Sequence, residues 1–291
     1  DALDAGADTL VMTFGLCRLG YYGELQEKIL TDLGYNFEFV NMSEEYDGNM
    51  RHFLRPLLKI NKKVSFPKLA KKTNEGLSML SHLDEMESYY YQNCGFETVP
   101  GSFLAAKKRY EKSLLLARNV TDIRRAYRKV HREYDSISIN KPPKPLRVGV
   151  IGDYYTAMDT FANINLEQRM ADMGVEVHRW INISNRQLRY PGKNMAMQTK
   201  KYIKYDMGPT STANIWAAKH YAENGFDGVI HVKAAGCTPE IDIMPVLQNI
   251  GMDYKMPILY LSFDSQTSDT GLETRLEAFY DMISMKKRIL V

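Results

Sequence analysis

Two short stretches of the sequence place a cysteine directly after an apolar run and before a helical pattern. One reads TLVMTFGLCRLG and contains Cys17, and the other reads GVIHVKAAGCTPE and contains Cys237. Each is typical of a β-strand followed by a glycine, the cysteine and a helix. The carboxyl ends of parallel strands form one edge of a sheet, and ligands bind beyond that edge. We therefore expect both thiols to face a binding site.

The residues after Cys237 favour a thiolate. Thr238 suits the N-cap of a helix, and Pro239 suits the first helical position. Cys237 is therefore expected beside unpaired backbone N–H groups and the positive end of the helix dipole, which lower the pKa of a thiol. A thiolate is the form that reacts and that binds metal ions. Cys17 and Cys237 are accordingly the candidate metal and cofactor ligands, and a packed small residue is the alternative for each.

Other polar residues give weaker signals. Cys94 follows a helical pattern in a loop without the strand and glycine context, so a structural role is expected. Asp153, in IGDYYTAMD, occupies the place that cysteine takes in the other two turns, and it is expected to face the same cleft. That turn lacks the second glycine and the lysine of a phosphate-binding loop. His231 lies inside an apolar strand and is expected to be a hydrogen-bonded core residue.

The composition is that of an ordinary globular protein. Of the 291 residues, 44% are hydrophobic and 25% are charged, and the net charge is +3. The basic run KKRYEKSLLLARNVTDIRRAYRKVHREYD is interleaved with acidic residues and is interpreted as a solvated helical face, so no nucleic-acid partner is expected. No apolar stretch reaches the roughly 18 residues of a membrane span, and no leader precedes a cleavage site. A cytoplasmic protein without membrane contact is expected.

The elements that position these residues follow an α/β pattern. ADTLVMTF, GLCRLGYYGELQEKILTDLGY and NFEFVN predict a strand, a helix and a strand, which form a βαβ unit with a parallel sheet. The sequence begins in mid-pattern without an initiator methionine, so we expect a further segment to precede residue 1. The next region has a helical period, and its expected helices lie near 49–60, 66–91, 102–117 and 121–135.

A proline-rich stretch, NKPPKPLRVGVIGD, predicts the start of a second α/β lobe. The expected strands of this lobe are 146–152, 175–181, 227–232 and 257–262. They alternate with expected helices near 157–173, 194–205, 210–224, 239–250 and 270–286. Such alternation predicts a doubly wound parallel sheet. The predicted domains are the C-terminal part of a first α/β lobe at 1–48, a helical segment at 49–140 and a second α/β lobe at 141–291.

The cysteine turns and the stretches around them resemble the 2-hydroxyacyl-CoA dehydratase D-component superfamily, in particular its branch related to acyl-CoA dehydratase activases. The similar stretches are ALDAGADTLVMTFGLCRLGYYGELQEKILTDLGYNFEFVN, PLRVGVIGDYYTAMDTFANINLEQRMADMGVEVHRW, GFDGVIHVKAAGCTPEIDIMPVLQNI and MPILYLSFDSQTSDTGLETRLEAFYDMI. The resemblance implies two flavodoxin-like lobes that face one another across a cleft with an iron–sulfur cluster, bound by cysteine thiolates. It makes Cys17 and Cys237 the cluster ligands in this chain, with a further cysteine upstream of residue 1. The turn Gly15-Leu16-Cys17-Arg18 departs from the family's Gly-Pro-Cys-Arg, which leaves the loop path there open.

The resemblance also implies a redox function. In related systems a separate ATP-hydrolysing activator donates low-potential electrons to this kind of subunit, and this chain has no Walker motif of its own. We expect an iron–sulfur cluster of the 4Fe-4S or double-cubane type that passes electrons to a small molecule or an acyl-CoA, in a reductase or an (R)-2-hydroxyacyl-CoA dehydratase component. The alternative is a cluster-free module that binds an acyl-CoA or a partner activase. The substrate and the oligomeric state, a homodimer included, stay open.

Overall fold

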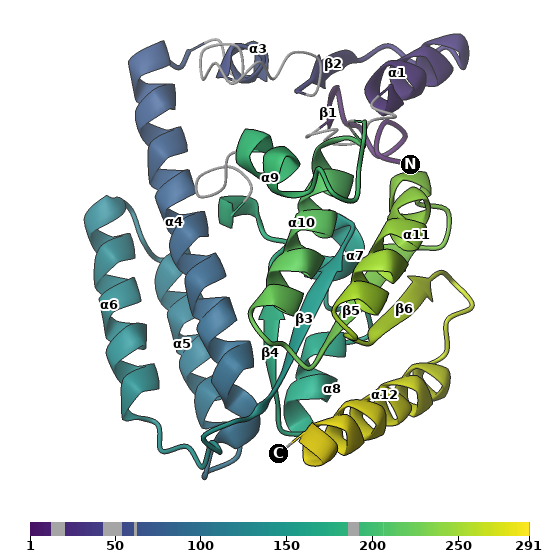
Figure 1. Cartoon of the computed structure of the whole chain (residues 1–291). Helices are drawn as coiled ribbons and strands as arrows, with labels where there is room; N and C mark the ends of the chain where they lie inside the picture. Colours follow the sequence, from purple (N-terminus) through teal and green to yellow (C-terminus); the bar gives the residue numbers. More distant parts are fainter. Residues whose placement is uncertain (13–20, 43–53, 61–62, 186–191, 206, 291) are drawn as a thin grey trace. The chain divides into compact units, whose positions relative to one another are not determined.

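The computed structural model describes residues 1–12, 21–42, 54–60, 63–185, 192–205 and 207–290 (Figure 1). The chain forms two compact units, Asp1–Gly76 and Leu77–Val291. Each unit contains a parallel β-sheet, so the predicted α/β class with two parallel-sheet lobes is confirmed. The predicted domain limits at 48 and 140 stay a prediction. Within the described ranges, no helix combines the length and the apolar composition that crossing a bilayer requires.

The first unit contains the βαβ pattern that the sequence predicts. Strands β1 (Thr9–Met12) and β2 (Glu38–Asn41) pair in parallel, and α1 (Tyr22–Asp32) lies between them in the chain. Gly34 adopts a φ of +87° directly after the C-cap Leu33, as expected for a glycine that ends a helix. The helix expected near 49–60 corresponds to the short α3 (Leu57–Ile60), and residues 49–53 lie outside the described part.

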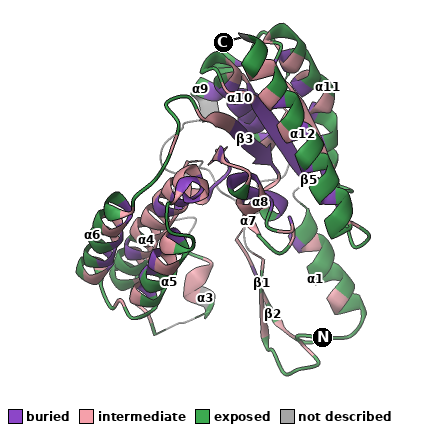
Figure 2. Ribbon diagram, turned by 90° about the horizontal axis from the view of Figure 1, so that it is seen from below, coloured by how far each residue is buried: buried purple, intermediate pink, exposed green. Residues whose placement is uncertain are grey.

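Three longer helices follow in the described part of the chain, with a short 3-10 helix directly after the first. In chain order, the four elements are α4 (Phe66–Asn93), η1 (Cys94–Phe96), α5 (Ser102–Leu115) and α6 (Val120–Ser136). Helix α6 begins where the Asn119 side chain accepts hydrogen bonds from the N–H groups of Thr121 and Asp122, as an N-cap does. Its apolar residues share one buried stripe at helical spacing: Ile123, Ala126, Val130 and Tyr134. Its lysines and arginines are all exposed. Figure 2 shows the buried and the exposed faces of the helix.

A four-stranded parallel sheet forms the centre of the second unit. Its strands are β3 (Leu146–Gly152), β4 (Val175–Arg179), β5 (Gly228–Ala234) and β6 (Ile258–Phe263). They lie in the order β4-β3-β5-β6. The strand that comes first in the sequence, β3, therefore lies between the second, β4, and the third, β5. This is the flavodoxin-like order, in which the chain changes direction of winding between the first and third strands. The switch point here lies between β3 and β5.

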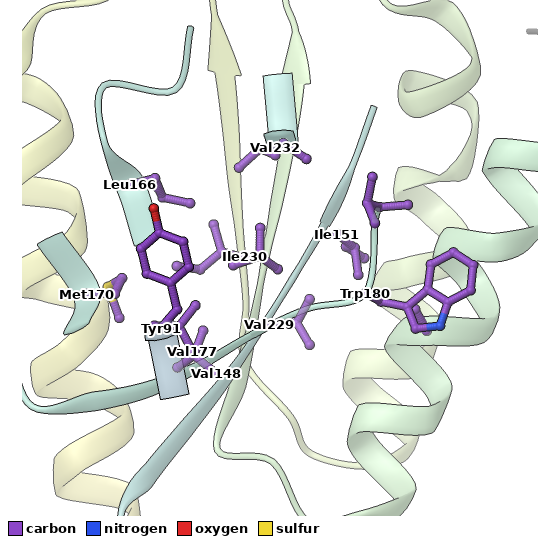
Figure 3. Packing of buried hydrophobic residues seen from close by; sticks show 14 of the residues in the cluster. Tyr91, Val148, Ile151, Leu166, Met170, Val177, Trp180, Val229, Ile230 and Val232 are labelled. Atoms are coloured by element: carbon purple, nitrogen blue, oxygen red, sulfur yellow. The ribbon is translucent and has the colours of Figure 1, made fainter. Parts of the chain in front are cut away.

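Within the described ranges, the following helices accompany this sheet: α7 (Tyr154–Met158), α8 (Leu166–Asp172), α9 (Gly192–Gln198), α10 (Pro209–Glu223), α11 (Thr238–Asp253) and α12 (Asp269–Leu290). They cover both faces. A Cβ atom on Gly149 of β3 would lie 2.2 Å from the ring of Tyr221 in α10, and one on Gly228 of β5 would lie 2.6 Å from Phe279 in α12. Because Gly149 pairs with Val229, the two glycines point to opposite faces of the sheet. Figure 3 shows the packed core on the strands.

Two of the expected helices are wrong in extent. The helix expected over 157–173 is two helices, because the Asp159 side chain accepts hydrogen bonds from the N–H groups of Phe161 and Ala162 and so forms a turn. Ile164 and Asn165 then adopt a φ of +54°, which no α-helix tolerates. The helix expected over 194–205 ends at Gln198, and the chain continues in turns.

Candidate functional site

Strands β3 and β5 end side by side at the switch point of the sheet. Gly152, the last residue of β3, pairs with Val232 of β5. The N–H group of Asp153 donates to the carbonyl oxygen of Val232 at 3.3 Å, so contact with β5 continues past the end of β3. Ligands of doubly wound sheets bind at this edge. The turns after β3 and β5 therefore form the candidate site.

Asp153 ties these two turns together. One carboxylate oxygen accepts a hydrogen bond at 2.8 Å from the N–H group of Thr156 and so caps α7. The other oxygen accepts one at 2.8 Å from the N–H group of Ala234, at the end of β5. The sequence placed Asp153 at the same edge as the cysteine turns, and for Cys237 the structure agrees. Both carboxylate oxygens of Asp153 are bound to backbone N–H groups, so this residue stabilises the two turns against each other.

Cys237 occupies the N-cap of α11. Its N–H group donates to the carbonyl oxygen of Ala234, and its own carbonyl oxygen accepts from the N–H group of Ile241, both at 3.0 Å. The prediction that Thr238 caps the helix and that Pro239 is its first residue is wrong by one position. The first helical hydrogen bond ends on Cys237, so Pro239 is the second helical residue, where its missing N–H group costs nothing. The side chain is partly exposed in an otherwise exposed turn.

A buried polar network lies beneath this turn. Glu240, in the first turn of α11, is fully buried and lies 2.7 Å from Nε2 of His231 in β5. Its carboxylate also accepts from the amide of Asn214 in α10, at 2.9 and 3.0 Å. The Asn214 side chain donates to the carbonyl oxygen of Gly152 and accepts from the Gly152 N–H group. Four elements, β3, β5, α10 and α11, are thus joined directly below the turn that carries Cys237.

Sequence reasoning identified one member of this network. His231 was expected to be a hydrogen-bonded core residue, and it is fully buried with a partner. Glu240 and Asn214 were missed. The signal available for Glu240 was its place three residues after a helix N-cap, the spacing of a capping box, but that pattern predicts an exposed side chain.

A buried cation lies next to the same turn. Lys233, on the same face of β5 as His231, is 6% exposed, and its ammonium group donates to the carbonyl oxygen of Ala235 at 3.2 Å. The first turn of α11 adds the partial positive charge of a helix N-terminus. The surroundings of Cys237 therefore combine a full and a partial positive charge, which suits an anionic ligand or a thiolate.

Of the other two cysteines, Cys17 and Cys94, the structure describes only Cys94. Cys17 lies outside the described residues, so its role as a ligand stays a prediction. Cys94 is buried in the core, and burial, together with the nearby carboxylates of Asp172 and Glu97, raises the pKa of its thiol to about 12. A thiol in this state stays protonated, so the structural role expected for Cys94 fits its surroundings.

An iron–sulfur cluster requires several thiolate ligands. Among the described residues, no group of three His, Cys, Asp or Glu side chains is arranged to hold a metal ion. Cys237 fits one ligand position, because it is partly exposed at a helix N-terminus on the ligand-binding edge of the sheet. The described part of the chain therefore provides a single thiol suited to a cluster.

Comparison with known protein families places the chain. The model of a family described as 2-hydroxyglutaryl-CoA dehydratase, D-component, matches residues 112–283. The match spans more than half of the chain and includes all four strands of the larger sheet and the turn with Cys237, whereas Cys17 lies outside it. A search of curated proteins returned no match. The chain belongs to the 2-hydroxyglutaryl-CoA dehydratase D-component family.

Proposed function

We propose that this protein is the electron-accepting component of a 2-hydroxyacyl-CoA dehydratase-like or related reductase system, and that Cys237 and Cys17 are ligands of an iron–sulfur cluster. The observation that supports this most is the position of Cys237. It lies at the N-terminus of α11, on the edge of the sheet where the winding direction changes between β3 and β5. In this fold that edge is where cofactors bind.

The chain's own residues have defined tasks in this proposal. Cys237 provides a thiolate, and the network of His231, Glu240 and Asn214 fixes the turn that presents it. Lys233 adds positive charge beside the negative charge that a thiolate-bound cluster carries. A cluster at this position would supply one-electron transfer at low potential. The proposed electron source is a separate ATP-dependent activator protein, and the proposed acceptor is an acyl-CoA or a small molecule.

Metal analysis of protein produced and purified without oxygen tests the proposal. Iron and acid-labile sulfide are measured for the unaltered chain and for Cys237→Ser and Cys17→Ser, and electron paramagnetic resonance spectra are recorded after reduction. Cys94→Ala is the matched control, because the Cys94 thiol is buried in the core. We expect bound iron and a reduced-cluster signal in the unaltered chain and in Cys94→Ala, and a loss of most of both in the other two variants.

The contrary result has a clear form. Iron that remains far below one cluster per chain after reconstitution, and that is the same in Cys237→Ser, would refute a cluster at this edge. The cluster-free alternative, a module that binds an acyl-CoA or a partner activase, would then stand. It predicts that an acyl-CoA raises the Tm of the unaltered chain and of Cys237→Ser by the same amount.

A further inference from the structure

Positive charge is concentrated in the hairpin of α5 and α6. Residues 102–136 contain ten Lys and Arg against four Asp and Glu, whereas the whole chain contains 38 against 35. The remainder of the chain is therefore net negative. An excess of positive charge on one hairpin raises the local concentration of negatively charged molecules. It points to an anionic ligand at this surface.

A groove on α6 gathers part of this charge. It has a volume of about 440 Å³ and is lined by Arg125, Tyr127, Arg128, His131 and Arg132. The volume is within the range of about 300–1,000 Å³ of small-molecule sites. The three arginines are exposed. The groove is therefore open to solvent and large enough for an organic ligand.

The arginines of the groove have hydrogen-bond donors to spare. Arg128 forms no ion pair with any residue in the described part of the chain, and Arg132 donates to the carbonyl oxygen of Arg128 at 3.2 Å. Arg125 reaches the carboxylate of Asp122 only at 3.8 Å. By contrast, Arg109 on α5 is paired closely with Glu133 of α6. Arg109 is thus neutralised between the two helices, whereas no carboxylate in the described part of the chain pairs closely with the three arginines of the groove.

The floor of the groove is aromatic and held in place. The ring of Tyr127 stacks on His82 of α4 with centroids 4.1 Å apart, and its hydroxyl donates to Glu85 at 2.7 Å. His131 lies edge-on to Tyr127 at 6.0 Å, and its Nδ1 is 2.8 Å from Asp135. The carboxylates of Glu85 and Asp135 are therefore engaged by Tyr127 and His131. The aromatic part of the groove lining is thus held in place by contacts.

The spacing of the arginines indicates more than one phosphate. Positions i, i+3 and i+7 lie on one helical face, and at a rise of about 1.5 Å per residue they span about 10 Å. Each guanidinium can bind a phosphate through two parallel hydrogen bonds. We propose that this groove binds the diphosphate group of an organic ligand, the chemistry that nucleotides and coenzyme A share. This site goes beyond the proposed redox function and does not depend on Cys237.

Titration calorimetry of the full chain at an ionic strength of about 0.15 M tests the inference with three probes: inorganic pyrophosphate, ADP and coenzyme A. We expect Arg128→Gln and Arg132→Gln each to weaken binding by about tenfold, the loss of one bidentate contact. Arg124→Gln is the matched control, because Arg124 is exposed on the same helix but does not line the groove. It should change the affinity by less than about twofold, since exposed charges outside a site act weakly in salt.

The outcomes separate the sources and the alternatives. Equal affinities for the three probes mean that the diphosphate suffices, and tighter binding of ADP or coenzyme A identifies the ligand class; both support the site. Absence of binding by all three probes, or equal weakening by Arg124→Gln, overturns it. Binding of polyglutamate or an RNA oligonucleotide that pyrophosphate does not displace also overturns it, in favour of a macromolecular partner. Cys237→Ser should bind the probes normally, so failure of the redox proposal is distinguishable.

Discussion

Replacing Glu240 with alanine measures how much the buried network beneath the Cys237 turn stabilises the α/β lobe. The change leaves two buried hydrogen-bond donors without an acceptor: Nε2–H of His231 and one amide hydrogen of Asn214. The second Asn214 hydrogen keeps its bond to the Gly152 carbonyl oxygen at 2.9 Å. Each unsatisfied buried donor costs about 1–3 kcal/mol. We therefore expect Glu240→Ala to lower the free energy of unfolding by about 2–6 kcal/mol.

Urea unfolding monitored by circular dichroism measures this loss of free energy of unfolding. Glu277→Ala removes an exposed carboxylate from α12 and is the matched control, with an expected change below about 0.5 kcal/mol. Glu240→Gln keeps one carbonyl oxygen as an acceptor. The free energy of unfolding that it loses should therefore fall between the losses of Glu240→Ala and Glu277→Ala. If Glu240→Ala lowers the free energy of unfolding by less than about 1 kcal/mol, and the m-value is unchanged, the network's role in stability is refuted.

The other predictions concern the buried residues Glu167 and Cys94 and the half-buried Gly95. Burial raises the pKa of Glu167 to about 7, despite Arg179 at 3.1 Å, so the folded chain holds a proton that the unfolded chain releases. Between pH 4.5 and about 7 the unaltered chain should lose about 2–3 kcal/mol of unfolding free energy relative to Glu167→Gln, whereas parallel urea-unfolding profiles would contradict this. Cys94, with its pKa raised to about 12, should resist iodoacetamide in the folded protein, as mass spectrometry would show. Gly95→Ala would place a Cβ 1.9 Å from the carbonyl oxygen of Ala171 and should cost about 1–3 kcal/mol, seen as a lower Tm.

The strands of the larger sheet were predictable because their signal is local. β3 was expected at 146–152 and lies at Leu146–Gly152. The other three strands begin and end within two residues of the expected positions. Apolar runs bounded by glycine, proline or polar residues specify strands without help from distant residues. The parallel arrangement also followed, because strands that alternate with helices along the chain form such sheets.

The break between α7 and α8 was not predictable from periodicity. The apolar residues on both sides fit one helix, and the difference comes from the Asp159 side chain and from the left-handed conformation at Asn165. Such local hydrogen bonds compete with the helix, and packing decides between them. The start of α11 was misplaced by one residue for a similar reason, since a threonine and a cysteine can both occupy an N-cap.

The sequence by itself determined the α/β class, the family and the placement of Cys237 at the end of a strand, because each depends on residue types and spacing along one stretch of chain. Only the tertiary structure decided the strand order that joins Asp153 to Ala234, 81 residues apart, and the burial of Glu240 against His231 and Asn214. These contacts depend on which elements pack together. The physical reason is that a side chain's solvation is set by neighbours from distant parts of the chain, which local patterns do not encode.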